Sequence, residues 1–307
     1  MLSDQAEIAV PVATVWTAPD AVRLIDVPAI VPIPNLKQWL STMSREENIA
    51  LCTEKRLQTQ VLFGDSVIIT ERSGDWVKVA VPTQASHRDP SGYPGWMPAC
   101  QLIEKADRSV EAGDQVMVMI ESQFAPLSLQ GTEQSLILSF ATFLPLIAEE
   151  KDSILVQTPI GTGSLRRADV CLPGQGLKGT GIEIVRNAQR FLDLPYLWAG
   201  MSAYGYDCSG FSYSMLRASG YLIPRDADDQ AEKGEAIPVN EMQPGDLLYF
   251  AYDKGRGEVH HVGIYAGEGR MVHSPTPGKK VSLIELTGTL LEKEVCTVRR
   301  YWKEGIK

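Results

Sequence analysis

The chain has 307 residues, with 29 Lys and Arg, 38 Asp and Glu, and a formal net charge of −9 at pH 7. This length predicts two or three domains. The modest acidic balance argues against a basic nucleic-acid surface, and no apolar run is long enough to cross a membrane, so neither nucleic acid nor membrane is an expected partner.

The sequence shows no targeting signal and no disulfide framework. Residues 1–7 carry neither a positive region nor an apolar core, which predicts no signal peptide and a cytoplasmic protein. A chain from which a leader had been removed would look the same. The five cysteines, at positions 52, 100, 171, 208 and 296, are odd in number and widely spaced, which is not typical of a set of disulfides.

The first third of the chain is predicted to be rich in β-strands. Apolar and polar residues alternate in short runs at 8–16, 66–70 and 76–81. Alternation with a period of two indicates strands, because successive side chains of a strand point to opposite faces. Roughly residues 35–56 have a helical pattern instead. An all-β region with a helical insert is therefore expected.

A weak internal repeat follows. The first copy comprises residues 62–69, 74–79 and 95–102, and the second comprises residues 140–147, 151–156 and 167–172. All-β units of this size predict two small barrels, at residues 1–105 and 106–175. The run Gly-Asp-Trp-Val-Lys-Val at 74–79, followed by Gly-Trp-Met-Pro at 95–98, resembles bacterial SH3-like domains. The second copy is degenerate, since Ile154 stands where the first has Trp76.

Residues 173–179 are the clearest linker, because they are rich in glycine and contain a proline. After them, Thr180 and Glu183 have the spacing of a capping box. The helix that they begin is expected to run to about Leu192 and to end before Pro195. A third domain is predicted at residues 176–307, with helices packed on an antiparallel sheet.

Cys208 lies in a turn that leads into a predicted helix. Gly205 and Gly210 flank it, and apolar residues at helical spacing follow over residues 211–218. A cysteine at the start of a helix faces free N–H groups and the positive end of the helix dipole. Both favour the thiolate, which is the nucleophilic form of cysteine.

Histidines follow on segments predicted as strands. Residues 245–250 and 261–266 form a predicted hairpin around the polar loop 253–258, and residues 271–274 follow the next turn. Alternation places His260 and His261 on opposite faces, so only one of them is expected to meet the cysteine. With His261 and His273 on neighbouring strands, the chain would hold a nucleophile, a base and a group that orients the base.

Other interpretations of these residues remain open at this point. A cysteine before a helix is more often a small buried hydrophobic residue, and a histidine in a strand is more often structural. Zinc bound by Cys208, His260, His261 and His273 is a weak alternative, because no paired ligand spacing is present. No metal site is predicted.

Residues 180–301 resemble the NlpC-type papain-like cell-wall peptidases. The matching pieces occur in the family's order, at 195–200, 207–211, 242–247, 261–265 and 273–274. One departure is Ala199, where a glycine is usual. The resemblance implies an α+β papain-like fold without cofactors, with Cys208 as nucleophile, His261 as general base and His273 as the orienting residue. It also implies that the Cys208 N–H and Tyr196 face the oxyanion.

Two SH3-like domains before an NlpC-type domain resemble the family of γ-D-glutamyl-L-diamino acid endopeptidases, also called dipeptidyl-peptidase VI. This resemblance implies hydrolysis of the bond between γ-D-Glu and Lys or diaminopimelate in murein peptides with a free N-terminal L-Ala. Such an enzyme would recycle wall peptides in the cytoplasm. The resemblance does not decide between lysine and diaminopimelate, and it leaves the oligomeric state unknown.

The substrate would need contacts for a cationic amine and for the carboxylate of D-Glu. Asp207 or Tyr93 is expected at the amine, with Glu54 or Asp65 as further acids between which the sequence does not choose. Arg225 or nearby N–H groups are expected at the carboxylate. The full predicted binding set is Tyr93, Tyr196, Trp198, Asp207, Ser209, Arg225, Asp226 and Ala227.

Two other functions remain as alternatives. The chain would be a wall-peptide binding module if its peptidase domain were inactive, although Cys208, His261 and His273 are all present. It would be an amidase or acyltransferase if the same three residues served another acyl group.

Overall fold

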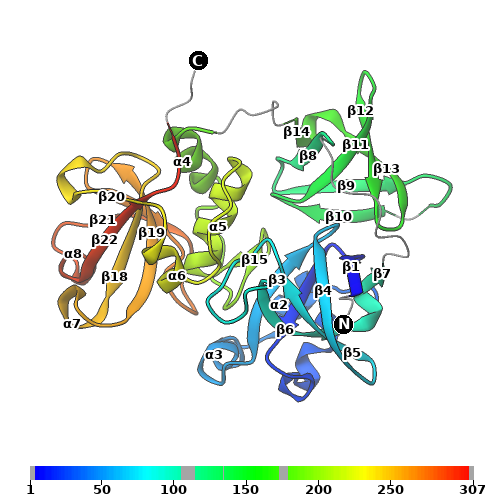
Figure 1. Cartoon of the computed structure of the whole chain (residues 1–307), viewed down its shortest axis with the longest axis horizontal. Helices are drawn as coiled ribbons and strands as arrows, with labels where there is room; N and C mark the ends of the chain where they lie inside the picture. The colour runs from blue at the N-terminus through cyan, green and yellow to red at the C-terminus, as the bar shows by residue number, and fades with distance from the viewer. Residues whose placement is uncertain (1–3, 105–114, 134, 173–178, 304–307) are drawn as a thin grey trace. The chain divides into compact units, whose positions relative to one another are not determined.

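The computed structural model describes residues 4–104, 115–133, 135–172 and 179–303 (Figure 1). These residues form two compact units. The first comprises described residues within 1–82, 91–175 and 202–204, and the second comprises those within 83–90, 176–201 and 205–307. The predicted boundaries at 105/106 and 175/176, and most of the predicted linker, lie outside the described residues, so the domain limits remain predictions.

The first unit begins with a seven-stranded antiparallel sheet whose strand order is β3-β2-β6-β5-β4-β1-β7. The expected strand over residues 8–16 is in fact two strands, because its halves have different partners: β1 pairs with β4 and β7, whereas β2 pairs with β3 and β6. The strands are β1 (Asp4–Ile8), β2 (Val12–Trp16), β3 (Leu57–Leu62), β4 (Ser66–Ser73), β5 (Trp76–Val81), β6 (Tyr93–Pro98) and β7 (Leu102–Glu104).

The helical insert between β2 and β3 is confirmed, but it begins at Pro19 rather than near residue 35. The buried carboxylate of Asp26 holds it together, accepting hydrogen bonds from Arg23 Nε and Trp39 Nε1, each at 2.8 Å. The helices are η1 (Pro19–Ala21), η2 (Leu24–Asp26), α1 (Val27–Ile30), α2 (Leu36–Thr42) and α3 (Arg45–Thr53), and η3 (Ala99–Gln101) precedes β7.

A second seven-stranded sheet repeats the topology of the first. Its order, β10-β9-β13-β12-β11-β8-β14, is the first order shifted by seven strands, which confirms the internal repeat. Phe63, in the turn after β3, is buried in the core of this second sheet, so one unit contains both sheets. The strands are β8 (Met117–Ile120), β9 (Phe124–Leu129), β10 (Ser135–Ser139), β11 (Phe143–Glu149), β12 (Ser153–Thr158), β13 (Gly161–Arg166) and β14 (Val170–Cys171), with η4 (Arg167–Asp169) before β14.

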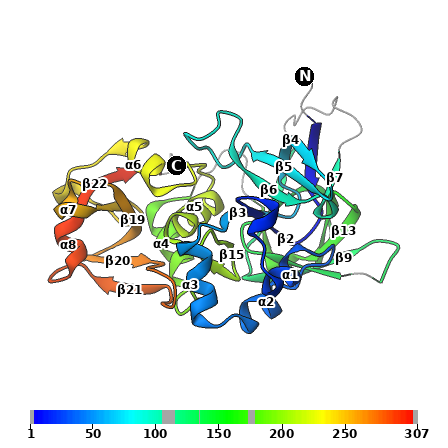
Figure 2. The same ribbon diagram turned by 90° about the horizontal axis from the view of Figure 1, so that it is seen from below.

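The second unit is built on a six-stranded antiparallel sheet of order β17-β22-β18-β19-β20-β21. Helices α4 (Gly181–Gln189) and α5 (Cys208–Ala218) pack against β19 and β20 (Figure 2). The sheet strands are β17 (Glu235–Ala236), β18 (Leu247–Ala251), β19 (Val259–Gly267), β20 (Arg270–His273), β21 (Ser282–Glu285) and β22 (Val295–Arg300). The remaining elements are β15 (Met201–Ser202), β16 (Gly205–Tyr206), α6 (Ala227–Glu232), η5 (Val239–Glu241), α7 (Tyr252–Gly255) and α8 (Leu290–Glu294).

Helix α4 begins as predicted and ends early. The capping box is present, since Thr180 N–H donates to Glu183 Oε2 at 2.7 Å and Glu183 N–H donates to Thr180 Oγ1 at 3.4 Å. The helix ends at Gln189 rather than near Leu192, and Asp193 then takes a positive φ of 68°. None of the helices in the described part of the chain has the length and apolar character that a membrane crossing requires.

Ala199 adopts a left-handed backbone with a φ of 60°, which explains why glycine would suit this position. We expect Ala199→Gly to raise the free energy of unfolding by about 1 kcal/mol, because the strain of the Cβ is removed. Ala188→Gly, inside α4, is the matched control and is expected to lower that free energy by about 1 kcal/mol or more. Urea unfolding of both variants measures the difference. If Ala199→Gly lowered the free energy of unfolding as much as Ala188→Gly, backbone strain at Ala199 would be refuted.

Candidate active site

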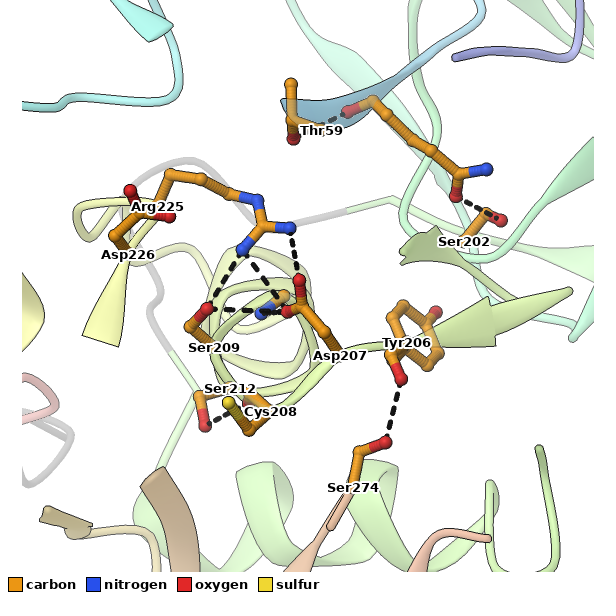
Figure 3. Close-up of polar contacts among 12 residues, drawn as sticks. Thr59, Ser202, Tyr206, Asp207, Cys208, Ser209, Ser212, Arg225, Asp226 and Ser274 are labelled. Carbon is orange, nitrogen blue, oxygen red and sulfur yellow. Dashed lines mark hydrogen bonds and ion pairs between the residues drawn. The ribbon is translucent and has the colours of Figure 1, made fainter. Parts of the chain in front are cut away.

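Cys208 is the first residue of α5, and Asp207 is the N-cap. The Asp207 Oδ1 atom accepts a hydrogen bond from Gly210 N–H at 2.6 Å (Figure 3). A side chain at Gly210 would bring its Cβ within 2.2 Å of the Gly200 carbonyl oxygen, so only glycine fits. The sequence Asp-Cys-Ser-Gly therefore places the thiol at the start of a capped helix, as predicted.

The environment of the thiol favours its neutral form. Burial raises the pKa of Cys208 to about 12, the Asp207 carboxylate adds to this shift, and the N–H groups of Ser209 and Val262 and the charge of Arg225 oppose it. The N–H group at the helix start lowers the thiol pKa in the predicted direction, but burial and a neighbouring anion outweigh it. Attack on a substrate then requires a base to take the proton.

His261 and His273 lie on neighbouring strands and are hydrogen-bonded to each other. Nε2 of His261 lies 2.8 Å from Nδ1 of His273, and each residue is 5% exposed. Burial lowers the pKa of His261 to about 3 and that of His273 to about 4. Both rings are therefore neutral near pH 7. When the Nε2–H group of His261 donates the hydrogen bond to Nδ1 of His273, the Nδ1 atom of His261 keeps a lone pair that can accept a proton.

His260 has separate partners, although the reason predicted for this is wrong. The pairing of β18 with β19 shifts between Phe250 and Ala251, so His260 is an extra residue in a β-bulge and strict alternation fails there. Its ring centroid lies 6.5 Å from that of His261, with planes 22° apart. His260 stacks on Tyr252 and has its Nε2 atom 3.2 Å from Glu294 Oε2. In the structure, therefore, His261 is the histidine of this pair that is bonded to His273.

A buried ion pair lies beside Cys208. Arg225, 1% exposed, places its Nη2 2.7 Å from Asp207 Oδ2 and donates from Nη1 to Ser209 Oγ at 2.9 Å (Figure 3). Its backbone N–H donates to the Ala85 carbonyl oxygen at 3.0 Å. In this structure the guanidinium of Arg225 is buried against Asp207, and the contact of Arg225 with a substrate carboxylate remains a prediction. Its observed partner is the helix cap.

Comparisons with known proteins follow the same division of the chain. A model of the NlpC/P60 family matches residues 193–300, and a model of the YKFC SH3b2 domain matches residues 120–172. A Gamma-D-glutamyl-L-lysine dipeptidyl-peptidase of Bacillus subtilis (strain 168) is 46% identical over 293 residues, covering 95% of this chain and 97% of that protein. The chain belongs to the NlpC/P60 family. A second protein of that name, from Bacillus cereus, is 38% identical over 310 residues, covering 97% and 91%.

Solved structures agree with this assignment. The crystal structure of an NlpC/P60 family protein from Bacillus cereus ATCC 10987 has a TM-score of 0.92 at 37% identity, covering 97% of this chain and 99% of that one. The predicted fold class is confirmed: SH3-like domains precede an α+β papain-like domain with an antiparallel sheet. This NlpC/P60 protein is a cysteine peptidase, as predicted.

The remaining predicted binding residues of the NlpC/P60 domain lie around the cysteine helix. Asp226 precedes α6, which begins at Ala227, and its carboxylate lies 3.4 Å from Arg88 Nη2. Tyr196, 5% exposed, forms a parallel bridge with Tyr206, which lies two residues before Cys208. Trp198 is half-buried in the following turn. Their contacts with substrate remain predictions.

The candidates from the first SH3-like domain lie in the other unit. Tyr93 begins β6 and is 2% exposed in the core of the first sheet. Glu54 is the C-cap of α3 and pairs with Arg56, and Asp65 accepts a hydrogen bond from Leu62 N–H at 3.3 Å in the turn after β3. Each of the two acids therefore has a local partner, and the substrate contact of Tyr93 remains a prediction.

Two residues that support the site, Gln230 and Ser274, were not in the predicted set of site residues. Gln230 donates from Nε2 to the Ser209 carbonyl oxygen at 3.2 Å and to that of Pro224 at 2.8 Å. Ser274 donates from Oγ to the Tyr206 carbonyl oxygen at 2.7 Å. The contacts with Ser209 and Tyr206 join residues 21 and 68 positions apart, so local spacing carries no signal of them.

The zinc alternative gains no support from the described part of the chain. There, the His, Cys, Asp and Glu side chains close enough together to hold an ion are His87, Asp228 and Asp229, rather than Cys208 with the histidines. His87 and Asp229 already bond each other, with Nδ1 2.9 Å from Oδ1. This pair raises the pKa of His87, through the hydrogen bond first and the Asp229 charge second.

Proposed function

We propose that the chain hydrolyses the bond between γ-D-Glu and the diamino acid, lysine or diaminopimelate, of murein peptides with a free N-terminal L-Ala. The observation that carries this proposal is the match over 95% of the chain to a protein named Gamma-D-glutamyl-L-lysine dipeptidyl-peptidase. The geometry supports it, because a thiol at a helix start and a bonded pair of neutral histidines lie in one unit.

The proposed reaction uses these groups in two steps. The sulfur of Cys208 attacks the γ-carbonyl carbon of D-Glu as its proton moves to Nδ1 of His261. The N–H of Cys208, at the start of α5, and the side chain of Tyr196 face the oxyanion. His261 then gives the proton to the departing amine of the diamino acid, which leaves a thioester. Water, deprotonated by His261, hydrolyses the thioester and regenerates the thiol.

The proposed contact for the L-Ala amine is the Asp207 carboxylate, which is 6% exposed. Because Asp207 is already paired with Arg225, an incoming ammonium adds a charge-assisted hydrogen bond to a carboxylate whose charge is shared. The loss of that hydrogen bond on acylation is therefore smaller than the cost of leaving an isolated buried carboxylate unpaired.

The test compares L-Ala-γ-D-Glu-L-Lys with its N-acetyl form. We expect the free peptide to have a kcat/KM about tenfold to a hundredfold higher, the value of one charge-assisted hydrogen bond. The α-linked peptide L-Ala-α-D-Glu-L-Lys is the control for the bond and should remain intact. Mass analysis identifies L-Ala-D-Glu and lysine as products, and the diaminopimelate peptide is assayed in parallel.

The outcomes separate the alternatives. Equal kcat/KM values for the free and acetylated peptides would contradict recognition of the amine. Tight binding without cleavage would indicate a binding module, and cleavage of another acyl bond alone would indicate an amidase or acyltransferase.

The chemistry of the amine also bears on where the enzyme acts. The L-Ala amine is acylated in intact wall and free only in released peptides, so the proposed substrate is a product of earlier wall cleavage. We propose a role in recycling such peptides in the cytoplasm, which cell fractionation tests.

A further inference from the structure

We propose that Ser274 is a positioning residue for the peptidase reaction, because its hydroxyl ties the strand end that carries His273 to the backbone that carries Cys208. This inference rests on the catalytic roles given to these residues under the proposed function. It names a residue absent from the predicted site.

The contact is short and buried. Ser274 Oγ donates to the Tyr206 carbonyl oxygen at 2.7 Å, and Ser274 is 0% exposed (Figure 3). Ser274 directly follows His273, the last residue of β20, and Tyr206 ends β16 two residues before Cys208. One hydrogen bond therefore joins the two segments that must be held in register for proton transfer.

The acceptor end of this bond is fixed by packing. The Tyr206 side chain is 0% exposed and lies edge-on to Phe191, with ring centroids 5.4 Å apart, and against Phe211 at 5.7 Å. Its carbonyl oxygen also accepts the Leu197 N–H at 3.1 Å. Ser274 is thus hydrogen-bonded to a carbonyl group that packing holds in place. If the Ser274 hydroxyl is removed, this carbonyl still accepts the Leu197 N–H.

Backbone segments, hydrogen bonds and packing form a closed set of connections that links Cys208, His273 and His261. From Cys208 the chain leads back to Tyr206, the hydrogen bond crosses to Ser274, and the chain leads back to His273. His273 is hydrogen-bonded to His261 at 2.8 Å, and β19, which carries His261, packs against α5, which begins at Cys208. Removing the Ser274 hydroxyl breaks the connection between Ser274 and Tyr206 and leaves Cys208, His261 and His273 themselves unchanged. Misplacement by about 1 Å can cost on the order of a hundredfold in rate.

The experiment uses the full chain and the Ser274→Ala variant. We expect kcat on L-Ala-γ-D-Glu-L-Lys to fall by about tenfold to a hundredfold, with KM within about twofold, because binding groups are unchanged. The rate at which iodoacetamide alkylates Cys208, followed by peptide mass spectrometry across pH, should fall in parallel. Ser274→Thr, which keeps the hydroxyl, should restore both readouts at least in part.

Ser219→Ala is the matched control. Ser219 is also buried on the same unit and donates from Oγ to a backbone carbonyl, that of Met215 at 3.1 Å, but it lies at the far end of α5. It should leave kcat and Cys208 alkylation unchanged. If Ser274→Ala does not fold, Ser274→Cys replaces it, since a thiol is a weak donor of similar size.

The outcomes are decisive in both directions. A kcat and an alkylation profile like those of the parent in a folded Ser274→Ala variant would overturn the proposal. A loss of thermal stability with both readouts unchanged would show a structural hydroxyl only, and would overturn it as well. If the parent does not cleave this peptide, the proposed substrate fails, yet Cys208 alkylation still tests the position of the thiol.

Discussion

Cys208→Ala abolishes peptide hydrolysis and leaves the fold intact: this is the largest effect expected for any single substitution. Without the thiol no thioester forms, and kcat/KM should fall by a factor on the order of 10⁴ or more. The alanine retains the N-terminal position of α5, and the Asp207 cap does not involve the sulfur. The measurement is cleavage of L-Ala-γ-D-Glu-L-Lys by mass analysis, with circular dichroism as the check on folding.

The control for this experiment is Cys100→Ala. Cys100 is exposed, and its sulfur lies 3.9 Å from the Ile30 carbonyl oxygen in the first unit. It should leave the rate near that of the parent. A Cys208→Ala protein with a substantial fraction of the parent activity would show that another group is the nucleophile.

The second large effect separates two adjacent histidines. His261→Ala should lower kcat/KM by about a thousandfold or more, because the base is lost, whereas His260→Ala should cost about tenfold or less. His260 bonds Glu294 and stacks on Tyr252, so its removal changes the surroundings of the base rather than the base itself. His273→Ala should be intermediate. Steady-state kinetics of the three variants give the order.

The pH dependence follows from the same geometry. The pKa of His261 is lowered to about 3, so the neutral, proton-accepting ring predominates above that pH, and acid inactivation through this group should appear only below about pH 4. Burial lowers this pKa most, followed by the charges of His273 and His260, so His260→Ala should move the acid limit upward by a smaller amount than the whole shift. In the kinetic comparison of the histidine variants, equal losses of kcat/KM for His260→Ala and His261→Ala would refute the assignment of His261 as the base.

The parts of the structure that depend on local sequence were predictable. Thr180 and Glu183 are three residues apart, and their capping box forms within one turn. The glycines at 205 and 210 and the helical spacing of apolar residues over 211–218 likewise predicted the cysteine helix, which spans Cys208–Ala218. The β-repeat was visible because turns and strands recur at similar intervals, and the two sheets have the same strand order.

The parts that depend on distant partners were not predictable. The pairing of Arg225 with Asp207, 18 residues away, leaves no trace in local spacing and was not predicted. The bulge at His260 arises from pairing of β18 with β19, and the alternation rule cannot detect one extra residue. The net direction of the Cys208 pKa shift was not predictable for the same reason, because the sequence indicates the helix start but not the packing around the thiol.

The segment Thr83–Pro90 has a consequence for how such a protein evolves. It lies between β5 and β6 of the first sheet, yet it belongs to the second unit. There the Thr83 carbonyl accepts from Tyr213 Oη at 2.7 Å, the Ala85 carbonyl accepts the Arg225 N–H at 3.0 Å, and His87 bonds Asp229. Conversely, residues 202–204, from the NlpC/P60 stretch, belong to the first unit, where Ala203 N–H donates to Ser139 Oγ at 2.9 Å.

Each unit is thus completed by residues from the other stretch of chain. A gene fusion that cut near residue 176 would leave the Tyr213 hydroxyl, the Arg225 amide and the Asp229 carboxylate without these partners, and Arg225 holds the cap of the cysteine helix. Recombination at the apparent domain border is therefore expected to produce proteins that lack these hydrogen bonds and are less stable. This NlpC/P60 domain and its first SH3-like domain are expected to be inherited together, as one heritable module.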